Sequence, residues 1–177
     1  GIISLIVYPF VILLIKLDDG GPIFISQERM GQNNKIIKIL KFRSMSVNDD
    51  GLAEKEKEQK ITRVGGFLRK TRIDELPQLW SILKGDMSLV GPRPEMPSLV
   101  KLYEKDIPYY HIRHLIKPGL SGWAQIYHHT PPKFDAGCDE TKTKLSYDLY
   151  YIKNHSFLLD FKIILKTLKA LLSRSGV

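Results

Sequence analysis

The sequence predicts a compact, helix-rich α/β domain of the α+β type. Its 177 residues fit one domain, and 43% of them are hydrophobic, which is enough for a buried core. Apolar residues recur at helical spacing in several segments, whereas only one segment, near the N-terminus, has the pattern of a β-hairpin. No βαβ repeat is visible, which argues against a doubly wound nucleotide-binding fold.

The first apolar run is too short to cross a bilayer. Residues 2–15 are almost all apolar, and charged residues end the run. A span needs about 20 apolar residues, whereas about 10–14 indicate a core helix, a re-entrant segment or an interfacial segment. Pro9 lies in the middle, where it removes a helix hydrogen bond and favours a kink. We therefore expect residues 1–17 to form a bent, re-entrant membrane helix, with a buried core helix as the alternative, and residues 18–177 to form the remaining domain.

A β-hairpin is expected next. Residues 24–27 alternate between apolar and polar side chains, residues 31–34 contain turn-forming glycine and asparagine, and residues 35–42 read as the return strand. Residues 49–60 are charged and nearly free of large apolar side chains. They indicate a solvated loop or a frayed helix without a binding role.

Helices are expected to dominate the rest of the chain. The segment VGGFLRKTRIDELPQLWSILKG has helical apolar spacing on both sides of Asp74 and Glu75, and Gly85 ends the pattern. GPRPEMPSL is stiffened by proline at first and helical from Pro97 onward. A Gly/Pro turn and a short strand-like piece in HLIKPGLSGWAQIY then precede the helical pattern of TKTKLSYDLYYIKNHS.

The C-terminal segment predicts a basic amphipathic helix. In residues 156–174 the apolar positions recur at helical spacing, and three lysines and Arg174 lie between them. Such a helix suits an anionic lipid surface, although a surface helix packed on the domain explains the pattern equally well.

Lysine and arginine outnumber aspartate and glutamate by 27 to 19, which gives a net charge of +8. This excess favours an anionic partner, whether nucleic acid, an anionic membrane surface or a phosphate-bearing substrate, and charge alone does not choose among them. One cysteine, Cys138, excludes an internal disulfide and suits a reducing compartment. We interpret it as a spare loop thiol.

Two adjacent acids in RIDELPQLW invite two interpretations. Residues 71–74 fit a capping-box-like helix start, and Pro77 is tolerated in a first helical turn, so the local pattern favours a plain cap. Adjacent helical residues point in different directions, however, so one acid can cap while the other reaches into a cleft. Asp74 and Glu75 could then serve chemistry on a phosphate, which a helix N-terminus also favours.

Cations recur in the flanking motifs, as Lys41 and Arg43 in LKFRSM, Arg69 in FLRKT and Arg93 in GPRPE. The arginine side chain presents a planar fork that matches phosphate oxygens. Mg²⁺ favours one or two carboxylates together with substrate phosphates, and carboxylates can act as covalent nucleophiles. The sequence has no GxGxxG and no P-loop, so phosphate binding has to come from residues such as these.

Four motifs follow one another in the chain: KFRSM, FLRKTRIDELPQLWSILKGDMSLVGPRPE, IKPGLSGWAQI and KLSYDLYYIKNHSFLLDFKIILKT. Together they resemble the bacterial sugar transferase family, the monotopic polyprenol-phosphate phosphoglycosyl transferases. The resemblance covers nearly the whole chain. It implies a membrane-associated catalytic domain with a re-entrant N-terminal helix and amphipathic interfacial helices.

The resemblance further implies transfer of a sugar-1-phosphate from a UDP-sugar to undecaprenyl phosphate, with release of UMP and with Mg²⁺ as cofactor. The reaction would pass through a covalent phosphosugar–enzyme intermediate and would start exopolysaccharide, O-antigen, capsule or glycan assembly. The enzyme would lie on anionic phospholipid at the bacterial inner membrane, with its catalytic domain on the cytoplasmic face. The sugar, the polymer, a homodimeric state and a multi-span region before Gly1 are left open.

By motif, the resemblance assigns Asp74 as the nucleophile and Glu75 as its dyad partner, and both as metal-binding residues. Pro9 corresponds to the break in the family's re-entrant helix, where Tyr8 replaces the common serine. The candidate residues for substrate and phosphate binding are Lys41, Arg43, Arg69, Arg93, Pro94 and Gln125.

The sequence departs from the family pattern after GWAQ. Many relatives continue with a Val-Asn-Gly-Arg-like stretch, whereas this chain has IYHHTPPKFDAGCDE, so an expected arginine contact has no obvious counterpart. We hypothesise that residues 126–140 help to select the sugar.

Two other classes of function compete with this interpretation. A nucleic-acid-binding module would explain the positive charge, but it predicts a basic stripe with interleaved aromatic residues, which the sequence lacks, and it leaves the apolar N-terminus unexplained. A membrane-surface scaffold would use the acid pair only as a cap. We expect an enzyme that does not bind nucleic acid.

Overall fold

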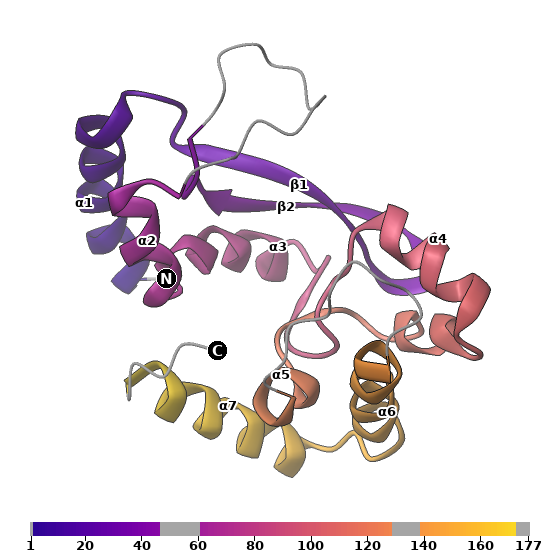
Figure 1. Ribbon diagram of the computed structural model, residues 1–177. Helices are drawn as coiled ribbons and strands as arrows, with labels where there is room; N and C mark the ends of the chain where they lie inside the picture. The colour runs from indigo at the N-terminus through magenta and orange to yellow at the C-terminus, as the bar shows by residue number, and fades with distance from the viewer. Residues whose placement is uncertain (1, 47–60, 129–138, 173–177) are drawn as a thin grey trace.

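The computed structural model describes residues 2–46, 61–128 and 139–172 (Figure 1). The charged segment 49–60, Cys138, Arg174 and most of the divergent segment 126–140 lie outside these ranges, and the expectations for them stay predictions.

The described chain has a helix-rich α+β fold, as the sequence predicts. Its α-helices are α1 (Ile2–Asp19), α2 (Arg63–Lys70), α3 (Leu79–Leu83), α4 (Pro97–Asp106), α5 (Trp123–Tyr127), α6 (Asp139–Lys153) and α7 (Phe157–Leu172). Short 3₁₀ helices are η1 (Gln32–Asn34), η2 (Ile73–Gln78) and η3 (Tyr110–His114). The strands are β1 (Phe24–Met30), β2 (Ile36–Phe42), β3 (Ser88–Val90) and β4 (Gly119–Ser121).

The predicted β-hairpin is confirmed as the antiparallel pair β1–β2. Its turn uses two left-handed asparagines, Asn33 and Asn34, with φ of 54° and 58°. In Figure 1 the hairpin crosses the top of the molecule, with α1 and α2 at one end, α4 at the other and α3 beneath it. Helices α5, α6 and α7 lie on the opposite side, and β3 pairs with β4 in parallel between the two groups.

Helix α1 packs on the domain along one side only. Val11 and Ile15 are buried in a cluster with Phe42 of β2 and Leu68 of α2. Other apolar side chains of α1 are exposed, and Leu17 is 74% exposed. Pro9 lies inside α1, which is one continuous helix from Ile2 to Asp19. Among the described helices, none combines the length and the apolar character that crossing a bilayer requires. The re-entrant arrangement therefore stays a prediction.

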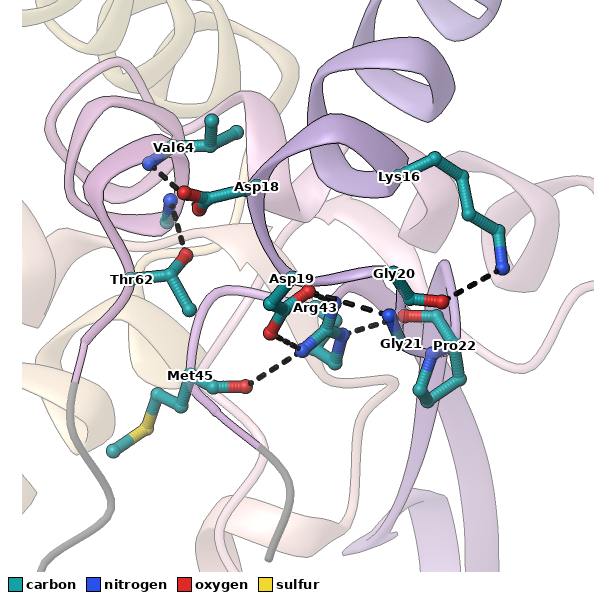
Figure 2. Close-up of polar contacts among 11 residues, drawn as sticks. Lys16, Asp18, Asp19, Gly20, Gly21, Pro22, Arg43, Met45, Thr62 and Val64 are labelled. Atoms are coloured by element: carbon teal, nitrogen blue, oxygen red, sulfur yellow. Dashed lines mark hydrogen bonds and ion pairs between the residues drawn. The ribbon is translucent and has the colours of Figure 1, made fainter.

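Polar contacts join the end of α1 to the start of α2 (Figure 2). Asp18 accepts a hydrogen bond from the backbone N–H of Val64 at 3.1 Å, and the Thr62 hydroxyl caps α2 by accepting from the Gly65 N–H at 2.9 Å. Asp19 forms an ion pair with Arg43, whose Nε also donates to the carbonyl of a residue in the loop before β1. The junction between α1 and the segment after β2 is thus fixed by charge-assisted hydrogen bonds.

Helix α2 approaches this junction closely because it contains glycine. A Cβ at Gly65 would lie 2.0 Å from the carbonyl oxygen of Ser44, so only glycine fits at this position. The close approach brings the end of α2, and with it the acid pair that follows, under β2.

Candidate active site

The acid pair lies in a 3₁₀ helix rather than at the start of an α-helix. After α2, Arg72 adopts a left-handed conformation with φ of 54°, and η2 then carries Asp74, Glu75 and Pro77 into α3. The predicted capping box is wrong, because no side chain caps η2 and the Thr71 hydroxyl donates back into α2, to the Phe67 carbonyl at 2.8 Å. The two acids are thus left available for other partners.

Both acids are buried, since Asp74 is 9% and Glu75 8% exposed. Burial of two adjacent carboxylates is unfavourable unless cations or protons compensate their charge. The two acids differ in the number of cationic side chains that contact them.

Glu75 is surrounded by cations. Arg93 donates to its Oε1 at 2.6 Å, Lys41 lies 3.3 Å from the same oxygen, and Arg72 lies 3.9 Å from Oε2. Burial alone would raise the pKa of Glu75, but the charges of Arg93 and Lys41, the hydrogen bond from Arg93 and the charge of Arg72 outweigh it and lower the pKa to about 2. Glu75 is therefore ionised throughout the neutral range.

Asp74 has no hydrogen-bond partner for its carboxylate among the described residues. Burial, followed by the negative charge of Glu75, raises its pKa, and the charges of Lys41, Arg69 and Arg93 limit that rise. A buried carboxylate with a raised pKa is more basic and hence a better nucleophile than an exposed one. The pair thus contains one acid neutralised by cations and one acid with a raised pKa.

Arg93 reaches Glu75 from a tightly held loop. The Gly91 N–H donates to the Ser121 carbonyl at 2.8 Å, and the Gly119 N–H donates to the Pro92 carbonyl at 2.9 Å. A Cβ at Gly119 would lie 2.0 Å from the backbone nitrogen of Gly91, so the two chains cross at glycine. This crossing fixes the backbone from which the Arg93 side chain extends.

A buried ion-pair network supports the same loop, and the sequence interpretation did not identify it. Arg113 donates to the Arg93 carbonyl at 2.9 Å and to Asp148 of α6 at 3.0 Å, and both charged residues are almost completely buried. Glu95 pairs with Lys144 of α6 and lies 3.7 Å from Arg113. The sequence signal for its buried pair was a charged residue, Arg113 or Asp148, among apolar and aromatic neighbours.

Two cavities are lined by Glu75 or by the cations that contact it. One, of about 200 Å³, is lined by Lys41, Arg93 and Pro94. The other, of about 320 Å³, is lined by Glu75, by Gln125 and mainly by apolar side chains of η2, β3, β4, α5 and α7. Glu75 thus lines the apolar cavity, and two of its cationic partners line the other, the cationic cavity.

The structure brings together some of the predicted residues and separates others. Lys41 and Arg93 contact Glu75, and Arg69 is close enough for its charge to act on Asp74. Arg43 instead pairs with Asp19 at the α1 junction.

Three predicted residues do not belong to the group of cations that contact Glu75. Pro94 lines the cationic cavity. Gln125 lines the apolar cavity, where its Oε1 is buried without a hydrogen-bond partner in the described structure. Pro9 lies in α1 and lines neither of the two cavities.

The dyad can supply carboxylates to a metal ion. Among the described residues no group of three or more histidine, cysteine, aspartate or glutamate side chains is placed to hold one. A Mg²⁺ site of one or two carboxylates plus substrate phosphates does not require such a group, and Asp74, whose carboxylate accepts no hydrogen bond from the described residues, fits that chemistry.

Comparisons with known proteins point to the same family as the four sequence motifs. Residues 1–174 match the family model described as bacterial sugar transferase. The chain is 44% identical over 167 residues to the UDP-N-acetylgalactosamine-undecaprenyl-phosphate N-acetylgalactosaminephosphotransferase of Aeromonas hydrophila, with 93% of this chain and 38% of that protein covered. It is 42% identical over 172 residues to the exopolysaccharide production protein PSS of Rhizobium leguminosarum bv. phaseoli, with 93% and 85% covered. It is 39% identical over 166 residues to the UDP-glucose:undecaprenyl-phosphate glucose-1-phosphate transferase of Escherichia coli K12, with 89% and 34% covered. The chain thus spans less than half the length of two of these relatives.

Proposed function

The chain belongs to the bacterial sugar transferase family, and we propose that it transfers a sugar-1-phosphate from a UDP-sugar to undecaprenyl phosphate and releases UMP. The observation that carries the proposal is the contrast within the dyad. Glu75 is ionised and neutralised by three cations, whereas Asp74 is buried and its carboxylate accepts no hydrogen bond from the described residues. The Aeromonas and Escherichia relatives are named as enzymes that carry out transfers of this kind.

In the proposed first step, a carboxylate oxygen of Asp74 attacks the phosphorus that bears the sugar. The bond from this phosphorus to the bridging oxygen breaks, and its electron pair leaves with UMP. The Glu75 charge makes Asp74 more basic, and Arg93 and Lys41 lie close enough to share their charge with phosphate oxygens.

In the second step, a phosphate oxygen of undecaprenyl phosphate attacks the same phosphorus. The bond to Asp74 breaks, which restores the carboxylate and yields undecaprenyl diphosphate-sugar. Mg²⁺, held by Asp74 and Glu75 with the substrate phosphates, would neutralise charge between carboxylates and phosphates. Asp74 thereby acts twice, as nucleophile and as leaving group.

The same proposal places the enzyme on the bacterial inner membrane, with the catalytic domain on its cytoplasmic face. Residues 1–17 would be embedded as a re-entrant helix. In support, Phe10 and Leu17 of α1 and Phe157 and Leu158 of α7 are 65–82% exposed, so both helices offer apolar side chains that the described domain does not cover. The product would begin the assembly of a bacterial surface polysaccharide or glycan.

The test is release of UMP by the membrane-reconstituted chain from a panel of UDP-sugars, with undecaprenyl phosphate and Mg²⁺. Asp74→Asn is expected to abolish release while leaving the melting temperature near that of the wild type. Asp106→Asn, at an exposed position in α4, is the matched control and should retain full activity. Substantial UMP release by Asp74→Asn would exclude Asp74 as the nucleophile.

The covalent intermediate is tested separately. Without acceptor, incubation with a UDP-sugar should add the mass of one sugar phosphate to the wild type and nothing to Asp74→Asn. UMP release that depends on acceptor, with no mass increase in any donor-only sample, would favour direct transfer between the substrates.

A further inference from the structure

The cationic cavity is lined by an arginine that the sequence did not assign to substrate or phosphate binding. Arg29, near the end of β1, lines the cavity of about 200 Å³ together with Lys41, Gln78 and Arg93. Three cationic side chains therefore line one small space, together with apolar side chains such as Ile39 and Leu99.

The hairpin register explains how Arg29 reaches this position. Ile25 of β1 pairs with Lys41 of β2, and Arg29 pairs with Ile37. Directly opposed residues share a face of an antiparallel pair, and every second residue along a strand returns to that face. Arg29 and Lys41 therefore lie on the same face of the hairpin, the one that also buries Ile39.

The contacts of Arg29 leave its charge uncompensated. Its Nη1 donates to the Glu28 carbonyl and its Nη2 to Gln27 Oε1, both at 2.8 Å, and both acceptors are neutral. Arg29 forms no ion pair with the residues that the structure describes, and Glu95, the acid in the same cavity, is already paired with Lys144.

Burial and the neighbouring charge of Arg93 both act against the charged form and lower the pKa of Arg29. A guanidinium nevertheless stays protonated in proteins, so this site cannot relieve the repulsion by losing a proton. Two like charges held close together beside Lys41 are stabilised most effectively by an anion bound between them.

We propose that Arg29 is a phosphate-binding residue for the donor and that, with Lys41 and Arg93, it forms the subsite for the diphosphate of the UDP-sugar. This inference rests on the proposed function. Among the two substrates, the donor fits this cavity because the apolar one, lined by residues such as Leu120, Ile164 and Leu168, suits the isoprenoid chain of the acceptor. The diphosphate would thereby contact Lys41 and Arg93, the two cations that also contact Glu75.

Steady-state kinetics of Arg29→Met test this assignment. We expect the KM for the UDP-sugar to rise at least about tenfold, the scale of one lost charge-assisted hydrogen bond, while the KM for undecaprenyl phosphate stays unchanged. Arg29→Lys should show a smaller rise, because it keeps the charge but loses the fork. Lys38→Met is the matched control, since Lys38 pairs with Glu28 on the other face of the hairpin and is exposed.

A titration with UDP, which does not require turnover, separates this inference from the proposed function. The wild type and Lys38→Met should bind UDP equally, and Arg29→Met should bind it at least about tenfold more weakly. Unchanged UDP affinity in a folded Arg29→Met or Arg29→Lys protein would overturn the inference, as would a rise confined to the KM for undecaprenyl phosphate. A wild type that binds UDP but releases no UMP would instead contradict the proposed reaction alone.

Discussion

Replacement of Arg93 by methionine is expected to change how the stability of this protein depends on pH. Arg93 is the first of the cations that lower the pKa of Glu75, and it donates the 2.6 Å hydrogen bond to that carboxylate. Without Arg93, the effect of burial is opposed by Lys41 and Arg72 alone, so the pKa of Glu75 should rise.

The magnitude follows from linkage between protonation and folding. A carboxyl whose pKa falls from 4.5 in the unfolded chain to about 2 in the folded protein contributes about 3 kcal/mol of stability at neutral pH. This contribution is complete above pH 4.5 and is lost as the pH falls toward 2. The Arg93 side chain is 36% exposed and therefore partly screened by solvent, so we expect Arg93→Met to remove about 1–2 kcal/mol of it.

The assay is the difference in unfolding free energy between the wild type and Arg93→Met from pH 7 to pH 2. The difference should be greatest at pH 7 and should narrow below about pH 5, because the wild type has more of the Glu75 contribution to lose. Lys105→Met, at an exposed position of α4, should give a difference that does not vary with pH. A difference for Arg93→Met that is equally constant would refute the assignment of Arg93 as the main cation on Glu75.

Three further predictions concern stability and are measured by denaturant unfolding. Asp148→Leu should cost about 3–5 kcal/mol because it leaves Arg113 charged and buried, and the double variant Arg113→Met/Asp148→Leu should recover most of that loss. Gly65→Ala should destabilise the protein because its Cβ would meet backbone at 2.0 Å, whereas Gly66→Ala, with no atom nearer than 3.9 Å, should stabilise it by about 0.5–1 kcal/mol. Asp19→Asn should lower stability by about 1–3 kcal/mol, because it leaves the buried Arg43 without its carboxylate.

Each of these predictions has an outcome that would contradict it. Equal losses in Asp148→Leu and the double variant would mean that the buried arginine is not the source of the cost. Equal effects of alanine at the two glycines of α2 would mean that close packing on Ser44 does not constrain the helix. A wild-type-like Asp19→Asn would show that the ion pair at the α1 junction contributes little to folding.

Local patterns predicted the hairpin, the helix beginning at Pro97 and the C-terminal helix, and the structure confirms all three. Each depends on periodicity or on proline within a short stretch of chain, which a sequence displays directly. The capping box at residues 71–74 failed for a related reason. Local spacing is compatible with an α-helix, but the left-handed turn at Arg72 and the packing of η2 under β2 produced a 3₁₀ helix instead.

The candidate site also contains residues that are neighbours in the sequence but have separate partners in the structure. Lys41 and Arg43 belong to one motif and were grouped as phosphate ligands by sequence. Lys41, in β2, contacts Glu75, whereas Arg43, just after β2 ends, pairs with Asp19 at the end of α1. The direction in which a charged side chain points after a strand ends is not contained in the motif.

The sequence by itself determined the family, the order of the motifs and the identity of the acid pair, because these are properties of neighbouring residues. Only the tertiary structure decided the separate environments of Asp74 and Glu75, the convergence of Arg29 with Arg93, and the burial of Arg113 against Asp148, its partner 35 residues away. The physical reason is that the energy of a charge depends on its burial and on the charges within a few ångströms of it. Both are set by segments that are distant in the chain.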